Sequence, residues 1–237
     1  MGQLFAGTSG WAYATWKPGF YPPKLASAKF LSHYSNRLNS VELNYTFRTF
    51  PKEKLRENWI DATPYSFKFS VKAHQSITHI KRLRDAASKA TDFIATLAQF
   101  ENTGRLGPIL FQLPPNLKCD LVLLKDFLEG IPRRPRYAFE FRHTSWFQDD
   151  VYSALRDKNV ALCQAESEDL QTPDVQTADF IYMRLRKETY SPKSRKALAA
   201  KVEQSIKSAD AFIYFKHEDD PAGAIYAEEL LKDVKGK

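Results

Sequence analysis

The stretch YAFEFRHTSW, residues 137–146, combines an alternating aromatic pattern with charged and titratable side chains. Successive side chains of a β-strand point to opposite faces. The three aromatic side chains at the start of this stretch therefore share one face, whereas Glu140 and Arg142 lie on the other and His143 follows them. A strand of this kind either lies at the surface or lines an enclosed polar interior.

Strand-like segments alternate with helix-like segments along the whole 237-residue chain. The expected strands are residues 4–10, 40–47, 66–74, 107–115, 137–146, 160–166, 180–186 and 211–217. The expected helices are residues 30–38, 52–60, 80–100, 121–131, 149–158, 194–208 and 224–234, and residues 80–100 carry the longest helical pattern. Such alternation predicts parallel βαβ units, and eight strands in this length predict a closed barrel.

We therefore predict an α/β fold, a single TIM-type (β/α)8 barrel of parallel strands over residues 1–237, in which some units can be irregular. No linker, repeat or break in composition divides the chain. An open doubly wound sheet is the alternative. Such sheets usually carry a GxGxxG turn after the first strand, and GTSGW at residues 7–11 lacks it.

The composition limits the compartment and the class of partner. Hydrophobic residues make up 43% of the chain and the net charge is +7, which fits a large core and an anionic partner, or simply a lysine-rich surface. No segment approaches the roughly 20 apolar residues that span a bilayer. The N-terminus lacks the features of a signal peptide, and the two cysteines form no CxxC pair. We expect a cytoplasmic protein without a membrane partner.

Polar and aromatic residues gather where the expected strands end, which is where TIM barrels carry their active sites. Arginine binds phosphate or carboxylate bidentately, and aromatic rings offer stacking surfaces for a base or sugar. The candidate catalytic residues are Glu42, Glu140 and His143. The candidate substrate- or anion-binding residues are Ser9, Trp11, Tyr13, Asn44, Lys72, His79, Gln112, Arg142, Trp146, Tyr182 and Arg184.

The barrel topology makes this set testable. We predict that six residues converge at one end of the barrel: Glu42, Lys72, Gln112, Glu140, Arg142 and Arg184. The structural alternative is that Glu140 and Arg142 belong to an ion-pair network that only holds the barrel together.

The cofactor is left unknown by the sequence. His74, His79, His143 and His217 with a glutamate have the ligand types of a divalent metal site. No HxH, HExxH or CxxC spacing indicates such a site, and no Walker loop, GxSxG elbow or kinase signature is present.

Several of these motifs together resemble the YecE-like family, also called domain of unknown function 72. They are GTSGWAY (7–13), Trp16 with GFYP (19–22), SVELNYTF (40–47), FKFSVKAH (67–74) with His79, LGPILFQLPP (106–115) and AFEFRHTSW (138–146). The resemblance implies a TIM-type barrel, in agreement with the strand count. The family's biochemical role is not established. A likeness of its barrel and pocket to metal-dependent apurinic endonucleases implies nucleic-acid or phosphate binding.

The last third of the chain departs from the family pattern. Members usually carry a histidine and a glycine after the arginine of strand seven and two asparagines at the end of strand eight. This chain instead has Arg186 and Lys187 after Leu185, Lys216 with His217, and Tyr226 in place of a later asparagine. These changes predict a more basic mouth, with an altered ligand or a weakened activity.

We expect a hydrolase-like enzyme acting on a phosphorylated small molecule or a nucleic acid at the C-terminal mouth. Glu42 and Glu140 would be acid, base or metal-binding groups, while the cations stabilise the anion. A non-catalytic binder of nucleic acid or nucleotide is the alternative. A carbohydrate-active enzyme using the two glutamates is a third reading. The sequence leaves the oligomeric state open.

Overall fold

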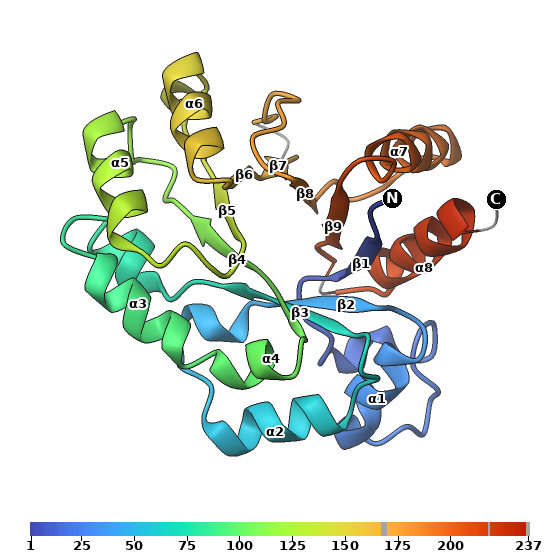
Figure 1. Cartoon of the computed structure of the whole chain (residues 1–237). Coiled ribbons are helices and arrows are strands. Elements are labelled where there is room, and N and C mark those ends of the chain that lie inside the picture. Colours follow the sequence, from blue (N-terminus) through green and yellow to red (C-terminus); the bar gives the residue numbers. More distant parts are fainter. Residues whose placement is uncertain (167–169, 218, 236–237) are drawn as a thin grey trace.

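The computed structural model describes residues 1–166, 170–217 and 219–235 and forms an α/β barrel of parallel strands (Figure 1). The strands are β1 (Leu4–Thr8), β2 (Ser40–Leu43), β3 (Lys68–Lys72), β4 (Leu106–Gln112), β5 (Tyr137–Glu140), β6 (Ala161–Leu162), β7 (Gln164–Ala165), β8 (Phe180–Leu185) and β9 (Asp210–Phe215). Only Cys163 separates β6, which pairs with β5, from β7, which pairs with β8. They form one interrupted strand, so the eight predicted strands are confirmed.

Helices lie outside the strands in Figure 1. They are α1 (Phe30–Ser35), α2 (Glu53–Asp61), α3 (Ala87–Ala95), α4 (Ala98–Asn102), α5 (Leu121–Gly130), α6 (Asp149–Asp157), α7 (Pro192–Ser205) and α8 (Ala222–Lys235). Side-chain caps fix two of the helix starts, because Asp120 accepts from Leu123 N at α5 and Ser191 accepts from Ser194 N at α7. Within the described ranges no helix is long and apolar enough to cross a bilayer.

Short helical turns follow several strands. They are η1 (Ala14–Trp16), η2 (Ser27–Lys29), η3 (Tyr45–Phe47), the π-helical η4 (Ser76–Ile80) and η5 (Thr144–Trp146). The unit after the sixth strand is irregular, since the described residues 170–179 between β7 and β8 contain no helix.

The predicted continuous helix over residues 80–100 is wrong. The chain forms an irregular turn after η4, and α3 and α4 then follow as two separate helices. Arg82, Leu83 and Asp85 have φ angles of 49°, 68° and 47°, which a right-handed helix excludes. Leu83 is buried in the core, so tertiary packing overrides the local helical periodicity.

Side chains close the ring between β1 and β2, which belong to different hydrogen-bonded sheets and share one isolated backbone bridge. The hydroxyl of Tyr34 accepts from Thr8 N at 2.8 Å and donates to Ser40 O at 2.9 Å. The amide of Asn39 accepts from one backbone group of β1 at 2.9 Å and donates to another at 2.7 Å. Both side chains thus replace ladder hydrogen bonds along this seam.

Replacing Tyr34 by phenylalanine is expected to destabilise the protein by about 1–3 kcal/mol, because two buried backbone groups lose a partner. Urea unfolding measures the change. Tyr152→Phe is the control, because Tyr152 is also buried but its hydroxyl has no hydrogen bond within the described residues. Equal losses in the two variants would contradict the role of Tyr34 in closing the ring.

The position of β5 shows that its charged face lines the barrel interior and does not lie at the surface. The strand ends at Glu140, so the predicted strand over residues 137–146 is too long, and η5 takes up its last part. Phe139 stacks on Phe111 of β4 at 5.2 Å and packs edge-on against Phe127 of α5 at 6.1 Å. The aromatic face therefore packs against a helix, and Glu140, which is 1% exposed, lies inside the barrel.

Candidate functional site

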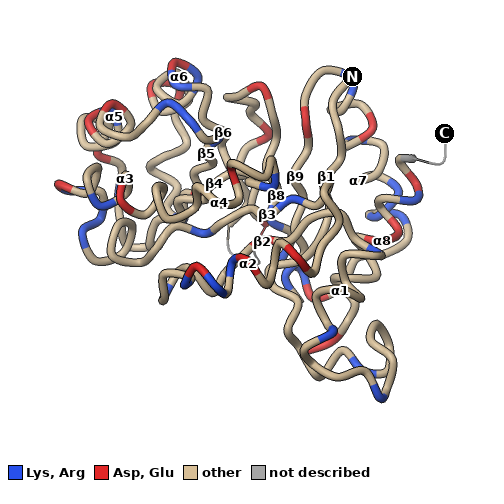
Figure 2. Tube along the Cα trace, turned by 60° about the horizontal axis from the view of Figure 1, so that its bottom comes forward, with Lys and Arg blue, Asp and Glu red and all other residues tan. Residues whose placement is uncertain are grey.

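Five of the predicted residues lie at or next to the carboxyl ends of inner strands: Glu42 on β2, Lys72 on β3, Gln112 on β4, Glu140 on β5 and Arg184 on β8. The strand register sets Gln112 opposite Glu140. Because parallel strands end at one rim, these side chains gather at the C-terminal mouth. Figure 2 shows charged segments of both signs beside β2, β3 and β8 near the centre of the barrel.

Arg184 joins the two glutamates. Its Nη1 donates to Glu140 Oε2 at 2.6 Å, and its Nη2 donates to Glu42 Oε1 at 2.7 Å. All three side chains are at most 2% exposed. Burial alone would lower the pKa of Arg184, but the two carboxylates outweigh burial and raise it. Arg184 therefore carries a permanent charge that compensates both carboxylates.

Further donors complete the carboxylate shells. Glu42 accepts from the hydroxyls of Ser9 at 2.8 Å and Tyr182 at 2.6 Å. Glu140 accepts from Gln112 Nε2 at 2.9 Å and from Arg186 Nη2 at 3.2 Å. Burial, with the charge of Glu42, raises the pKa of Tyr182 well above its ordinary value, so this phenol stays a neutral donor. We call this set of seven side chains the arginine–glutamate network: Ser9, Glu42, Gln112, Glu140, Tyr182, Arg184 and Arg186.

Lys72 differs from the other cations at the mouth. Its ammonium lies 4.1 Å from the ring centroid of Phe47, a cation–π contact, and within the described residues it makes no hydrogen bond or ion pair. Burial, the charge of Arg184 and, more weakly, that of Lys216 lower its pKa to about 8 although both glutamates oppose the shift. The side chain is thus close to the network without being part of its hydrogen bonds.

His79 lies on the same aromatic ring. Its imidazole packs edge-on against Phe47 with centroids 4.9 Å apart, and its Nδ1 is 2.9 Å from the hydroxyl of Thr78. Burial first, then the charges of Lys72 and Arg142, lower its pKa below the ordinary 6.5. The imidazole is therefore predominantly neutral at pH 7.

Two of the buried polar atoms without a hydrogen-bond partner among the described residues directly follow strands whose ends form the mouth. They are Oδ1 of Asn44, which follows β2, and Nε of Arg186, which follows β8. Buried polar groups are normally satisfied, so such atoms are available to a ligand or to water.

The remaining candidates have structural contacts or stand apart. Trp146 is fully buried, stacks on Phe141 at 4.6 Å and donates to Leu117 O at 2.8 Å. His143 accepts from Ser145 N at 3.1 Å and caps η5. Trp146 presents no free face to a ligand, and Tyr182 is likewise buried in the network. His143 is partly exposed, and its printed hydrogen bonds use only Nδ1. The stacking role predicted for Trp146 and Tyr182 does not fit their burial.

Residues after β1 border the mouth less directly. The hydroxyl of Tyr13 donates to Ser9 O at 2.9 Å, and the indole of Trp11 packs edge-on against Trp59 at 5.5 Å. Arg142 lies beyond the end of β5 and is exposed, because the strand stops two residues earlier. It is a rim cation next to His79 and not a member of the buried network.

The positions that depart from the family pattern also reach this region. Lys187 pairs with Glu166 at 3.4 Å, and His217 Nε2 lies 3.0 Å from Glu188 O. Arg186 bonds Glu140, and Lys216 lowers the pKa of Lys72. Of these positions, Arg186 and Lys216 add cations to the mouth, whereas Lys187 pairs with Glu166 away from the network.

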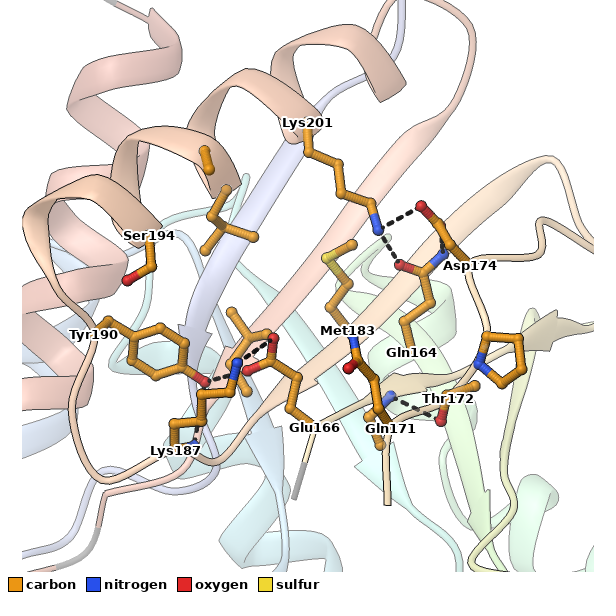
Figure 3. Close-up of a pocket in the computed structure, with 15 residues that line it drawn as sticks. Gln164, Glu166, Gln171, Thr172, Asp174, Met183, Lys187, Tyr190, Ser194 and Lys201 are labelled. Carbon is orange, nitrogen blue, oxygen red and sulfur yellow. Dashed lines mark hydrogen bonds and ion pairs between the residues drawn. The ribbon is translucent and has the colours of Figure 1, made fainter. Parts of the chain in front are cut away.

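A separate cavity of about 550 Å³ lies between β8, α7 and residues 171–174 (Figure 3). Met183 and Leu185 line it, whereas Arg184, the residue between them, faces the barrel interior. Two ion pairs compensate charges in this cavity, Lys201 with Asp174 at 2.9 Å and Lys187 with Glu166 at 3.4 Å. The four charged side chains that line this cavity thus pair among themselves.

Among the described residues, no cluster of three or more histidine, cysteine, aspartate or glutamate side chains is arranged to hold a metal ion. The two glutamates of the mouth are bonded to Arg184.

Fold and site define an α/β-barrel protein with a buried arginine–glutamate network and a cationic rim at its C-terminal mouth. The chain belongs to the DUF72 family, because the family model, described as "Protein of unknown function DUF72", matches residues 5–237.

Two curated relatives and one solved structure are similar to this chain. The UPF0759 protein YunF of Bacillus subtilis (strain 168) is 33% identical over 160 residues, which cover 63% of this chain and 54% of YunF. YecE of Escherichia coli (strain K12) is 30% identical over 118 residues, 49% of this chain and 43% of YecE. The matches thus span about half the length of these curated relatives.

A crystal structure of a DUF72 family protein from Thermotoga maritima MSB8 superposes with a TM-score of 0.88 at 26% identity and covers 98% of this chain and 99% of that one. The barrel fold and the family resemblance are both confirmed.

Proposed function

We propose that the C-terminal mouth binds the phosphate group of a small molecule or nucleic acid and that the protein is an enzyme acting on this ligand. The observation that carries the proposal is an excess of cations at the mouth. Arg184 and Arg186 already compensate Glu42 and Glu140. Further cations, Lys72 and Arg142, lie close enough to lower the pKa of His79.

A phosphate bound near Lys72 and Arg142 would reduce the electrostatic repulsion between these cations. Lys72 lies at the end of β3 and Arg142 at the rim, and both act on His79, so an anion bound beside His79 would be attracted by both cations. The buried Nε of Arg186, which has no partner in the described part of the chain, adds a donor. Preorganised cations and donors of this kind also stabilise charge that develops in a transition state.

The bonds of the two glutamates change the roles expected from the sequence. Their oxygens accept from Arg184, Ser9, Tyr182 and Gln112, so they position the network and are poorly placed to carry protons. For phosphoester hydrolysis, the neutral imidazole of His79 is the better proton acceptor for an attacking water. The same bonds disfavour the carbohydrate-active reading, which needs two available carboxyl groups.

A non-catalytic nucleic-acid binder is the second candidate, because the chain carries a net charge of +7. Binding of that kind weakens steeply with salt and needs no proton acceptor. An enzyme in which His79 accepts a proton would lose turnover more than affinity when His79 becomes Gln.

A thermal-shift screen with inorganic phosphate, nucleotides and short oligonucleotides tests the phosphate site. Ligands that bind the folded state raise its melting temperature by mass action. We expect such a rise in the wild type and its loss in Arg142→Ala. Arg133→Ala is the matched control, because Arg133 is an exposed arginine in the loop that precedes β5, at the opposite end of the strand. Equal responses of the two variants would contradict the site.

A further inference from the structure

Lys72 is held in an unusual position for an ammonium group. It shares the inner face of β3 with Ser70, which is buried and lies 2.7 Å from the hydroxyl of Tyr214 across the barrel. The hydroxyl of Thr46 lies 2.7 Å from the carbonyl of Lys72, which ties η3 to the end of β3 and sets the ring of Phe47 under the ammonium. The ring face is thus the contact of this ammonium, which has no hydrogen-bond acceptor or ion-pair partner among the described residues.

This environment favours the free amine. A lysine with a pKa of about 8 has about a fifth of its amine unprotonated at pH 7.4, against about a thousandth at the ordinary value. Desolvation beside other cations is a common way to activate a lysine as a nucleophile. The network supplies such a cation in Arg184, which its bonds to both glutamates hold in place.

We propose that Lys72 is a nucleophile that forms a Schiff base with an aldehyde or ketone carrying a phosphate group. The inference rests on the proposed function for the phosphate group and goes beyond it in assigning a carbonyl group and a covalent step. The carbonyl carbon would lie at the Nζ of Lys72, and the phosphate toward the rim cation Arg142.

The step needs no further reactant. The lone pair of Nζ adds to the carbonyl carbon, the nitrogen gives up one proton and the carbonyl oxygen takes one up, which gives a neutral carbinolamine. That oxygen leaves as water after a second protonation, which produces the iminium ion, and addition of water reverses the sequence. His79 also packs on Phe47, and the charge of Lys72 lowers its pKa, so we assign the proton transfers to this neutral imidazole.

Reductive trapping tests the proposal. The wild type is incubated at pH 7.4 with pyridoxal 5′-phosphate or with pyridoxal, reduced with borohydride and mapped by peptide mass spectrometry. We expect Lys72 to be labelled at least tenfold faster than exposed lysines such as Lys125, with a rate that rises to half its maximum near pH 8. Lys72→Arg keeps the charge but cannot form the imine, and it should remove this fast labelling.

Comparison of pyridoxal 5′-phosphate with pyridoxal distinguishes the Schiff-base proposal from the proposed phosphate site. Fast labelling of Lys72 by both, without a preference for the phosphorylated one, would support the Schiff base and contradict the phosphate site. Fast labelling that depends on the phosphate and is blocked by inorganic phosphate would support both. Labelling of Lys72 no faster than that of Lys125 with either aldehyde would overturn the Schiff-base proposal, whether or not the protein binds inorganic phosphate.

Discussion

Replacement of Arg184 by methionine is expected to destabilise the protein by about 3–5 kcal/mol, the largest loss among single substitutions at the mouth. The substitution leaves Glu42 and Glu140, which are at most 1% exposed, without their shared counter-charge. An unpaired buried carboxylate costs several kcal/mol, and here two lose the same partner. Urea unfolding followed by tryptophan fluorescence at pH 7 measures the loss.

Arg195→Met provides the matched control. Arg195 pairs with Glu229 at 3.3 Å on α7 and α8, and both side chains are partly exposed. Exposed pairs contribute about 0–1 kcal/mol, so this variant should unfold almost as the wild type does. A loss of less than about 1 kcal/mol in Arg184→Met would contradict the buried network.

Replacement of Lys72 by methionine is expected to stabilise the protein by about 1–3 kcal/mol at pH 7. Lowering the pKa of this lysine from 10.5 to about 8 corresponds to about 3 kcal/mol against the protonated form in the folded state. Partial exposure and the contact with Phe47 offset part of this cost. Functional groups in active sites often lower the stability of the folded protein. Removal of a lysine that stabilises the fold would instead lower the free energy of unfolding.

The pH dependence gives the prediction a second test. Between about pH 8 and 10.5 the unfolded chain binds the proton that folded Lys72 has lost, so wild-type stability rises with pH. The advantage of Lys72→Met should therefore shrink over this range and vanish above about pH 10.5. Lys125→Met, at an exposed position of α5, should show neither the gain nor this dependence. A Lys72→Met variant less stable than the wild type at pH 7 would contradict the account.

Much of the barrel could be predicted because its signals are local and repeated. The two-residue alternation at residues 137–146 put Glu140 and the aromatic residues on opposite faces, and the parallel topology then brought the strand ends together. The helix over residues 80–100 could not be predicted correctly. Its periodicity is helical, but burial of Leu83 imposes a turn that depends on contacts distant in sequence.

The site was harder to predict, because its geometry also depends on contacts between residues distant in sequence. Arg142 follows the alternation of β5, but the strand ends before it, so it reaches the rim and not the interior. The roles of Phe47 and Arg186 were missed. Phe47 lies within a segment that reads as strand but turns after Leu43. An aromatic residue directly after a strand that ends in polar groups is the signal that could have identified it.

The most direct test of the central claim is calorimetric titration of the wild type and Lys72→Met with inorganic phosphate at pH 7 and low salt, with Lys125→Met as the control. We expect saturable, salt-sensitive binding to the wild type and to the control, and at least tenfold weaker binding to Lys72→Met. Equal affinity in all three proteins, or no binding to any of them, would contradict a phosphate site at the barrel mouth.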